Sequence, residues 1–283
     1  MIDLHTHSIY SDGTETPQEL VKRAHHARLT AFAIADHDTV AGLDEALHEG
    51  KRLGMRVISA VELTCDCEGG HIHIVGYGFD YRNGALGEAL RKRGEERNIQ
   101  FNEKVALANK RLLEKGKGQI DAGELLGTLT GIPGRPHIAR AIVAKGWAGG
   151  FREAFDTYLL DYVPETPAFD SAHACVLIHN AGGITSLAHP GSDEIGLKRF
   201  VHNDADEYKV IDELRAQGLD CLEAYTPAHT QVLIDYYLKI AQDKGMGVTG
   251  GTDWHGPTFD APAPGEFAIP DHCMKEINKS LNI

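Results

Sequence analysis

The sequence has no long apolar run and no export signal. No uninterrupted stretch approaches the roughly 18 apolar residues that a membrane-spanning helix needs. The segment that begins at Met1, MIDLHTHSIYSDG, lacks both the basic start and the apolar core of a signal peptide. We therefore expect a cytoplasmic protein with no membrane partner.

Cysteine and positive charge are also scarce. The five cysteines are scattered and odd in number, which argues against a disulfide framework in a chain of 283 residues, so we expect reduced thiols. The 28 Lys and Arg against 41 Asp and Glu leave a net charge of −13 at pH 7 with His neutral. Long nucleic acid is bound by surplus cations that neutralise phosphates. The charge balance therefore argues against long nucleic acid as a partner, but it leaves a small anionic substrate open.

Short apolar segments alternate with amphipathic helical segments along most of the chain. This alternation is typical of parallel strands joined by crossover helices. The expected strands are residues 2–6, 31–35, 55–61, 71–77, 184–188, 219–225 and 247–250. The pattern predicts an α/β fold, namely a (β/α) barrel with one unit fewer than the usual eight, although a doubly wound open sheet fits almost as well.

The alternation stops in the middle of the chain. One long, highly charged helix is expected from residue 84 to about residue 115, with shorter helical pieces near residues 136–145 and 151–160. We interpret residues 81–167 as an inserted helical subdomain. Residues 1–80 and 168–283 would then form the barrel.

Histidine and carboxylate side chains collect at or near the carboxyl ends of the expected strands. In a barrel or an open α/β sheet these ends converge on one face, where ligands bind. The side chains are His5, His7, Asp36, His37, Asp38, Glu62, His73, His189, Glu223, Asp253 and His255. The period of two along a strand places His5 and His7 on the same side. Mixed imidazole and carboxylate ligands suit Mn²⁺, Fe²⁺ or Zn²⁺ better than Ca²⁺.

Ordered motifs along the chain resemble those of the PHP (polymerase and histidinol phosphatase) phosphoesterases. They are DLHTHSIYSDGTETPQELV, ADHDT, a Glu in VELT, HIVGYG, GRPHIARAIV, LAHPG and TGGTDWHG, and they extend from residue 3 to about residue 256. The resemblance implies a distorted (β/α)7 barrel that holds up to three divalent metal ions. We expect Mn²⁺, with Fe²⁺ or Zn²⁺ as alternatives.

The same resemblance implies which residues bind the metals. A first ion would be held by His5, His7, Glu62 and Asp253. Glu62 would bridge to a second ion that His73 and His189 also hold, and Asp12, His37 and His255 would hold a third. Alternation along the strand does not choose between His71 and His73. We favour His73 because it is nearer the carboxyl end of its expected strand and directly precedes the apolar run IVGYG.

The insert with its GRPHIAR motif resembles one branch of the family. That branch removes the 3′-phosphate of nucleoside 3′,5′-bisphosphates, which here implies attack by a metal-bridging hydroxide. Arg135 can bind a phosphate in bidentate fashion, and we expect Arg135 and His137 to read the second, non-reacting phosphate. A helix-capping role for Arg135 is the alternative. His229 is our candidate for the general acid, with an exposed histidine at a helix start as the alternative.

Other functions share the same core motifs. A 5′→3′ exonuclease on short RNA ends would use every metal ligand, whereas a histidinol phosphatase would leave the Arg135-bearing insert unexplained. A non-catalytic metal-binding regulatory domain is a further alternative, which the full ligand set weakens. The run from Arg91 to Arg97 is interpreted mainly as a solvated helix face, and Cys65 and Cys67 as part of a loop. Trp254 either stacks on a base or packs in the interior.

Overall fold

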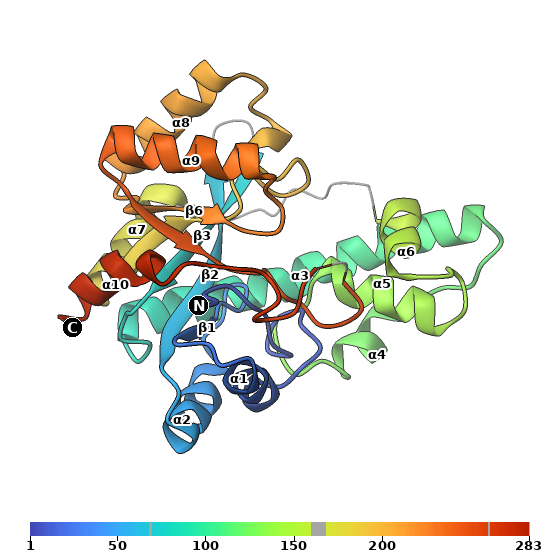
Figure 1. The fold of residues 1–283 in the computed structure, drawn as a ribbon. Coiled ribbons are helices and arrows are strands. Elements are labelled where there is room, and N and C mark those ends of the chain that lie inside the picture. The colour runs from blue at the N-terminus through green and yellow to red at the C-terminus, as the bar shows by residue number, and fades with distance from the viewer. Residues whose placement is uncertain (68–69, 160–167, 260, 283) are drawn as a thin grey trace.

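A computed structural model describes residues 1–67, 70–159, 168–259 and 261–282, and it has an α/β architecture around a strongly curled sheet (Figure 1). The strands are β1 (Phe32–Ile34), β2 (Val57–Cys67), β3 (Gly70–Tyr77), β4 (Phe169–Asp170), β5 (Ile184–Leu187), β6 (Cys221–Tyr225) and β7 (Gly247–Gly250). They are ordered β1-β2-β3-β5-β6-β7, and β4 pairs with β2 off this path.

Helices surround the sheet and extend from it on one side (Figure 1). They are α1 (Pro17–His26), α2 (Leu43–Leu53), α3 (Gly84–Glu114), α4 (Ala122–Leu126), α5 (Arg135–Ala144), α6 (Phe151–Tyr158), α7 (Ser171–Asn180), α8 (Asp204–Ala216), α9 (Gln231–Lys244) and α10 (Lys275–Ser280). Two short 3₁₀ turns, η1 (Leu197–Arg199) and η2 (Asp271–Met274), complete the described elements. None of the helices in these ranges is both long and apolar enough to cross a bilayer.

The N-terminal segment lies between the two edge strands of the sheet. On one side the Ala33 N–H of β1 donates to the Asp3 carbonyl at 2.9 Å. On the other side the Leu4 N–H donates to the Gly250 carbonyl of β7 at 3.2 Å. Residues 2–6, which we expected to form the first strand, therefore occupy a strand's place, although their pairing is limited to isolated bridges. This connection brings His5 and His7 next to the residues that follow β7.

The expectation of parallel strands throughout is wrong for β3. Strand β1 is parallel to β2, and β5, β6 and β7 are parallel to one another in sequence, but β3 is antiparallel to both β2 and β5. A parallel connection needs a crossover of a dozen or more residues, and only residues 68 and 69 separate β2 from β3. Strand β2 also continues to Cys67, so Cys65 and Cys67 lie in a strand and not in the expected loop.

Local signals set the helix ends where the sequence has strong caps. The Thr16 hydroxyl accepts from the Glu19 N–H at 3.2 Å while the Glu19 carboxylate accepts from the Thr16 N–H at 2.8 Å, which is a complete capping box ahead of Pro17. Helix α2 begins at Leu43 after Gly42 and is followed by Gly54, which caps it in a left-handed conformation with φ of 68°.

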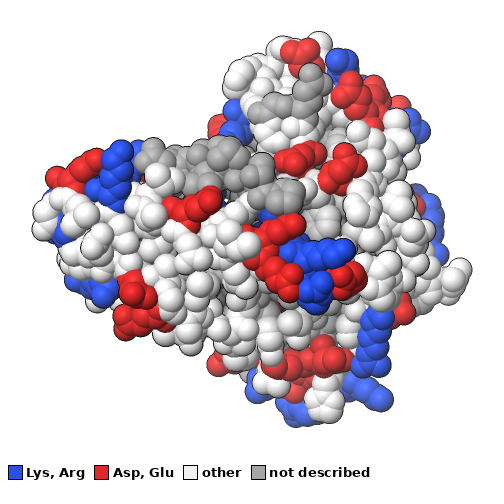
Figure 2. All heavy atoms as spheres, turned by 180° about the vertical axis from the view of Figure 1, so that it is seen from behind, with Lys and Arg blue, Asp and Glu red and all other residues white. Residues whose placement is uncertain are grey.

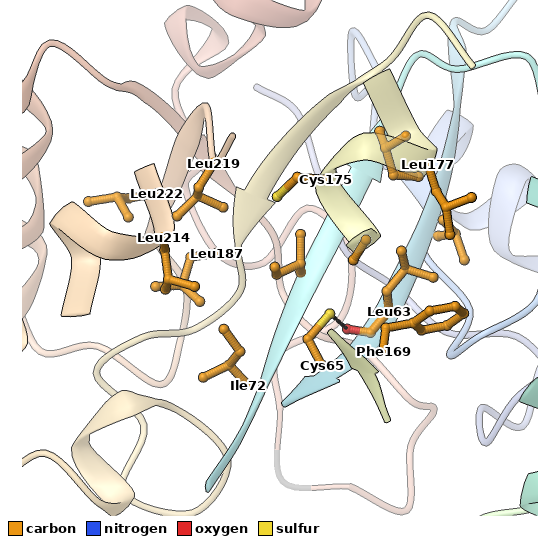
Figure 3. Close-up of a cluster of buried hydrophobic side chains, with 14 of the residues drawn as sticks. Leu63, Cys65, Ile72, Phe169, Cys175, Leu177, Leu187, Leu214, Leu219 and Leu222 are labelled. Atoms are coloured by element: carbon orange, nitrogen blue, oxygen red, sulfur yellow. Dashed lines mark hydrogen bonds between the residues drawn. The ribbon is translucent and has the colours of Figure 1, made fainter. Parts of the chain in front are cut away.

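Apolar side chains from the strands and from the helices α7, α8 and α9 form the largest core (Figure 3). Strands β2 and β3 contribute Leu63, Cys65 and Ile72, and α7 contributes Cys175 and Leu177. Burying each such side chain stabilises the fold by about 1.5–3 kcal/mol relative to exposure. All five cysteines are free thiols.

Helices α3 to α6 form an arm with its own apolar cluster. The first turns of α3 pack on the main core through Leu86 and Leu90. Its later turns pack with α5 and α6 through a separate set that includes Phe101, Ile138 and Tyr158. We refer to α3–α6 as the helical arm. The expected subdomain limits at residues 81 and 167 stay a prediction, since residues 160–167 lie outside the described part of the chain.

Charged side chains of both signs are interspersed on the face seen in Figure 2. Lysines and arginines there lie beside aspartates and glutamates rather than in one broad basic surface. Exposed pairs on the arm include Arg91 with Glu88 at 2.9 Å and Arg152 with Asp156 at 2.9 Å. Pairs this exposed contribute at most about 1 kcal/mol each.

Candidate metal centre

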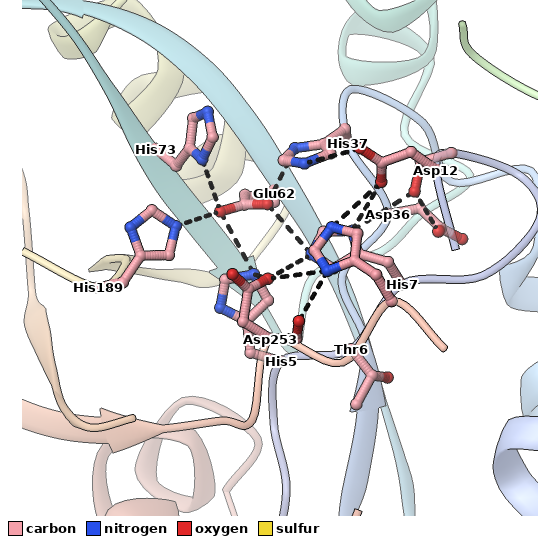
Figure 4. Close-up of polar contacts among 12 residues, drawn as sticks. His5, Thr6, His7, Asp12, Asp36, His37, Glu62, His73, His189 and Asp253 are labelled. Atoms are coloured by element: carbon pink, nitrogen blue, oxygen red, sulfur yellow. Dashed lines mark hydrogen bonds and ion pairs between the residues drawn. The ribbon is translucent and has the colours of Figure 1, made fainter. Parts of the chain in front are cut away.

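The Glu62 carboxylate lies at the centre of a ring of imidazoles (Figure 4). Its Oε1 is 3.3 Å from His5 Nε2, 3.0 Å from His73 Nδ1 and 3.1 Å from His189 Nε2. Its Oε2 is 3.3 Å from His7 Nε2 and 2.9 Å from His37 Nδ1. The two oxygens of one buried carboxylate thus face two different sets of imidazoles, which is the geometry of a group that can bridge two cations.

Two further carboxylates extend this cluster on the side of His7. Asp253 Oδ1 lies 3.0 Å from His7 Nε2 and 3.6 Å from His5 Nε2. Asp12 Oδ1 lies 3.3 Å from His255 Nε2, and Asp12 Oδ2 lies 3.8 Å from His37 Nε2. The His7 and His255 rings are stacked at 4.0 Å between centroids. The cluster therefore continues without a break from Glu62 to Asp12.

Three groups within the cluster have ligand atoms close enough to share one ion each. In every group the ligand atoms lie within 4.8 Å of one another, and the groups are His5, His7, Glu62 and Asp253, then His37, Glu62 and His73, then His7, Asp12, His37 and His255. The sequence assignment had the same members in the first group. It placed His189 where the second group has His37, and it left His7 out of the third. His189 still contacts Glu62.

Several buried polar atoms of the cluster lie close to one another but make no hydrogen bond of acceptable geometry. They are His5 Nε2, His7 Nε2, Asp12 Oδ1, His37 Nδ1, Glu62 Oε2, His73 Nδ1 and His189 Nδ1. A buried polar group that lacks a partner costs about 1–3 kcal/mol, so a concentration of such groups in a native site calls for a ligand. Divalent cations fit this donor set, because imidazole and carboxylate are the ligands that Mn²⁺, Fe²⁺ and Zn²⁺ accept.

Burial and neighbouring charges shift the pKa values of adjacent groups in the cluster in opposite directions. Burial raises the pKa of Glu62, but the surrounding imidazoles outweigh burial and hold that pKa well below its usual value. Burial lowers the pKa of His37, but Glu62 and Asp12 outweigh it and raise that pKa to about 9. The pKa of His7 falls to about 3 through burial and the neighbouring His255 and His37. Protons and metal ions compete for such groups.

The loop that carries Asp12 is shaped by a buried carboxylate that precedes His37. Asp36 Oδ1 accepts from the Ser8 N–H at 2.7 Å and from the Ser11 hydroxyl at 2.6 Å. At other strand ends the backbone itself is unusual, since His189 has φ of 29° and Asp253 has φ of 54°. Positive φ is uncommon outside glycine and is retained where the surrounding structure fixes it.

Glu223 is a site residue to which the sequence reasoning gave no role. It is buried on β6, its Oε1 lies 3.1 Å from His5 Nδ1, and its Oε2 accepts from the His189 N–H at 2.7 Å. It therefore holds the His5 imidazole from the side opposite Glu62 and holds His189 through its backbone. A carboxylate behind a metal-binding histidine fixes the orientation of the ring. The signal in the sequence was its place on the sixth expected strand.

The expected solvated face of α3 is wrong for Arg93 and Arg97. These side chains are 2% and 7% exposed, whereas Arg91 is 53% exposed. Arg93 Nε and Arg97 Nη1 donate to Asp38 Oδ2 at 3.2 and 2.5 Å. The spacing of four residues places both arginines on one side of the helix, against the strands.

The choice of His73 over His71 agrees with the contacts, but the reason for it was wrong. His73 Nδ1 faces Glu62, whereas His71 Nδ1 lies 2.7 Å from Asp66 Oδ1. We had favoured His73 because it is nearer the carboxyl end of its strand. Strand β3 is antiparallel to β2 and β5, however, so its amino-terminal half, and not its carboxyl end, lies at the edge of the sheet where the carboxyl ends of β1 and β5 lie. His73 pairs with Thr64 of β2, two residues beyond Glu62.

The arm places His137 near Asp12, whereas Arg135 contacts an aromatic ring of the arm itself. His137 is buried and its Nδ1 accepts from the Gly134 N–H at 3.0 Å, and burial lowers its pKa to about 4 despite the nearby Asp12. The ring is therefore neutral with its proton on Nε2. The Arg135 guanidinium lies over the Phe155 ring, 5.1 Å from the centroid.

His229 does not have the contacts of a general acid. Its Nδ1 lies 2.9 Å from the Ala224 carbonyl and its Nε2 accepts from the Gly191 N–H at 2.9 Å. Both ring nitrogens are thus engaged by the backbone, and burial lowers the pKa of His229 to about 4. The ring stacks on Tyr237 at 4.9 Å. These contacts give His229 a structural role in the loop after His189, and it is neither exposed nor oriented to donate a proton.

Trp254 packs in the interior and does not face the cluster. Its Nε1 donates to Glu15 Oε2 at 2.8 Å, and the ring packs with Leu20 and Ala24 of α1. The alternation of side chains explains this, because Asp253 and His255 on either side point into the cluster.

A family model described as "PHP domain" matches residues 3–162 of the chain. The chain belongs to the PHP domain family. Three PHP relatives are similar along most of their length. A 5′-3′ exoribonuclease of Haemophilus influenzae is 31% identical over 90% of each chain. A phosphoribosyl 1,2-cyclic phosphate 1,2-diphosphodiesterase of Eggerthella lenta is 29% identical over 95% of this chain and 98% of the relative. A 3′,5′-nucleoside bisphosphate phosphatase of Chromobacterium violaceum is 28% identical over 90% of this chain and 87% of the relative.

The PHP fold is shared with a solved structure as well. A crystal structure from Bifidobacterium adolescentis, assigned as a metal-dependent phosphoesterase, superposes with a TM-score of 0.86 at 30% sequence identity, covering 99% of this chain and 96% of that chain. The superposition therefore includes both the curled sheet and the helices. With the family match and the buried histidine and carboxylate cluster, it identifies this PHP protein as a metal-dependent phosphoesterase, a hydrolase.

Proposed function

We propose that this PHP enzyme removes the 3′-phosphate of nucleoside 3′,5′-bisphosphates and leaves nucleoside 5′-monophosphates. The observation that carries the proposal is the Glu62 carboxylate, whose two oxygens face separate sets of buried imidazoles beside the arm that holds Arg135. The bisphosphate phosphatase of Chromobacterium violaceum, similar over most of both chains, supports the choice of substrate. A small nucleotide substrate also agrees with the expected cytoplasmic location.

The proposed metal ligands are the nine residues of the sequence assignment, within a distorted (β/α)7 barrel that carries residues 81–167 as its insert. They are His5, His7, Asp12, His37, Glu62, His73, His189, Asp253 and His255. We propose up to three divalent ions, with Mn²⁺ first and Fe²⁺ or Zn²⁺ as alternatives. When bound, such ions neutralise phosphate charge and lower the pKa of coordinated water towards about 7.

The residues of the arm supply the proposed recognition of the non-reacting phosphate. The neutral His137 ring can donate its Nε2 proton to a phosphate oxygen, since its Nδ1 already accepts from Gly134. Arg135 begins α5 two residues earlier and offers a planar guanidinium for bidentate contact. We do not assign the proton for the leaving oxygen to His229, because both of its nitrogens are engaged.

A 5′→3′ exonuclease on short RNA is the second candidate. The exoribonuclease of Haemophilus influenzae is 31% identical over 90% of each chain, slightly more similar than the bisphosphate phosphatase at 28%. This activity uses the same metal ligands and the same cleavage of a phosphate ester. It differs in requiring space for further nucleotides beyond the first.

A comparison of kcat/KM on five substrates tests the proposal. The set is a nucleoside 3′,5′-bisphosphate, a 5′-phosphorylated RNA oligomer, a phosphoribosyl 1,2-cyclic phosphate, histidinol phosphate and an aryl phosphate. We expect the bisphosphate to be preferred at least roughly 100-fold, about 2.7 kcal/mol in transition-state stabilisation. A preference for the RNA oligomer would establish the exonuclease instead, and equal values on all five would show a non-selective phosphoesterase.

A further inference from the structure

One of the three ligand groups is held from the side of the helical arm. It consists of His7, Asp12, His37 and His255, and we call it the outer group. We propose that Arg140 and Phe259 are positioning residues for the outer group, so that binding of its cation depends on the arm. The inference rests on the proposed metal centre, and it concerns what controls the occupancy of one of its ions.

Arg140 holds the loop that carries Asp12. From the second half of α5, its Nη2 donates to the carbonyl oxygen of Asp12. The Arg140 guanidinium also lies over the Phe259 ring, with Cζ 5.6 Å from the centroid. The Arg140 side chain therefore joins the Asp12 loop to the segment after β7. These two segments supply Asp12 and His255 to the outer group.

Phe259 continues this contact to His255. Its ring centroid lies 4.8 Å from that of His255. The His255 ring also stacks on His7 at 4.0 Å between centroids. His255 Nδ1 donates to the Asp253 carbonyl at 2.7 Å, which leaves Nε2 facing Asp12. Phe259 in turn packs on Phe151 of α6 at 4.4 Å, so the arm supports His255 through an aromatic contact.

A backbone contact fixes the same loop at a second point. The Ile132 N–H, in the segment before α5, donates to the Tyr10 carbonyl at 2.8 Å. Gly131 approaches Tyr10 so closely that a Cβ there would overlap the Tyr10 carbonyl group. The arm thus docks on the loop just before Asp12 by contacts that no larger residue at position 131 would permit.

The group around His5 is supported in a different way. His5 and His189 are both held by Glu223 of β6, and Glu62 lies within β2. These supports belong to the sheet. Substitution of Arg140 should therefore disturb the outer group. The contacts that support the group of His5, His7, Glu62 and Asp253 should stay intact.

Calorimetric titration of Mn²⁺ into the metal-stripped full-length protein tests the inference. Arg140→Met keeps the apolar stem and removes the guanidinium, and Phe259→Leu removes the aromatic contact on His255. Outer-shell changes typically cost 10–100-fold in metal affinity, so we expect each variant to weaken one Mn²⁺ site by about that factor and to leave the remaining sites unchanged. The double variant should weaken the site by less than the product of the two effects, because both act on one group.

The direction of the change in Mn²⁺ affinity distinguishes a positioning role of Arg140 from a purely electrostatic one. If Arg140 acted only through its positive charge, its removal would tighten the binding of a cation. Arg152→Met is the matched control, since Arg152 lies on α6 of the same arm, is 71% exposed and pairs with Asp156. It should not change any site. Circular dichroism without metal checks that each variant is folded, and if Arg140→Met does not fold, Phe259→Leu decides the result.

Three results would overturn the inference: unchanged Mn²⁺ binding by folded Arg140→Met and Phe259→Leu, tighter binding by Arg140→Met, or equal weakening of every site. A wild-type protein that binds no Mn²⁺, Fe²⁺ or Zn²⁺ would instead overturn the proposed metal centre itself. The two failures are therefore distinguishable in the same titration.

Discussion

Glu62 has the central position in the cluster because each of its oxygens serves a different set of imidazoles. Its charge is retained at full burial only because those imidazoles outweigh the cost of desolvation. An isolated buried carboxylate would be protonated instead. The residue thus has the chemistry of a bridge between cations, and the residues that orient its neighbours should control the affinity of the centre.

Substitution of Glu223 tests whether a residue that orients the neighbours of Glu62 sets the metal affinity. Glu223→Gln keeps the size of the side chain but turns an amide NH₂ towards either His5 Nδ1 or the His189 N–H, both of which Glu223 now contacts through carboxylate oxygens. We expect metal affinity to fall about 10–100-fold while the fold is retained. Metal titration measures the loss. Glu213→Gln is the control, because Glu213 is an exposed residue of α8 that pairs with Lys209. Equal affinities for the two variants would contradict the role of Glu223.

Substitution of Arg135 tests recognition of the second phosphate. Arg135→Ala removes a charged donor, and such hydrogen bonds contribute about 1.5–3 kcal/mol. We expect kcat/KM on a nucleoside 3′,5′-bisphosphate to fall about 10–100-fold and kcat/KM on an aryl phosphate, which lacks a second phosphate, to stay within about twofold. Arg152→Ala on the neighbouring helix should change neither. An unchanged kcat/KM of Arg135→Ala on the bisphosphate would remove Arg135 from the proposal.

At the scale of elements, α3 is joined to the sheet by a buried ion cluster. Asp38 is fully buried, accepts from the Thr64 N–H at 2.9 Å and faces Arg93 and Arg97 of α3. Because Asp38 directly follows His37, this cluster also fixes the loop that brings His37 to Glu62. Burial makes the carboxylate difficult to remove without leaving positive charge in the interior.

Substitution of Asp38 should therefore destabilise the fold. Removing one partner of a buried ion pair costs about 3–5 kcal/mol, and we expect Asp38→Ala to lower the free energy of unfolding by about that amount. Urea unfolding at fixed metal concentration measures it. Asp44→Ala is the control, because Asp44 is 70% exposed and pairs with Arg82 at the surface, where the expected loss is below about 1 kcal/mol. Equal losses for both variants would contradict a buried ion cluster.

The sequence predicted elements well where the signal is local. The expected apolar segments overlap the observed strands apart from the two-residue β4, and the long helix expected from residue 84 is α3. The direction of β3 was not predicted, because the period of two is the same in parallel and antiparallel strands. The short connection between β2 and β3 does indicate the antiparallel direction, because it is too short for the crossover that parallel strands need. The burial of Arg93 and Arg97 was missed for a related reason, since charge alone does not say which helix face meets a carboxylate.

For the site, the order of histidines and carboxylates along the strands predicted which residues meet. It did not predict Glu223, Asp36 and Asp38 as supports, because their roles depend on which backbone N–H or imidazole lies opposite. The structural role of His229 depends likewise on the Ala224 carbonyl and the Gly191 N–H, and its sequence position gives neither.

At the scale of the whole molecule, the cluster joins segments from nearly the full length of the chain. His5 lies between β1 and β7, and Asp253 contacts it from the other end of the sequence. Ligands that bind the folded protein alone stabilise it by RT ln(1 + [L]/Kd), about 2.7 kcal/mol at 100 times Kd. Metal binding should therefore stabilise the whole sheet and not a single loop.

Removal of metal should lower thermal stability accordingly. For one site near 100 times Kd we expect chelation to lower Tm by roughly 5–10 °C, since 1 kcal/mol corresponds to about 2–4 °C in chains of this order of size. Differential scanning calorimetry before and after dialysis against a chelator measures the shift. Added Mn²⁺ should restore Tm, and a Tm that is independent of metal would contradict the structural part of the account.

The most direct test counts ions and activity in the same preparation. Elemental analysis of the purified enzyme should find at least two and up to three divalent ions per chain. Removal of these ions should abolish phosphoesterase activity, and Mn²⁺ should restore it. A preparation with full activity and no bound divalent ion would contradict the claim that the buried imidazoles and carboxylates around Glu62 form a catalytic metal centre.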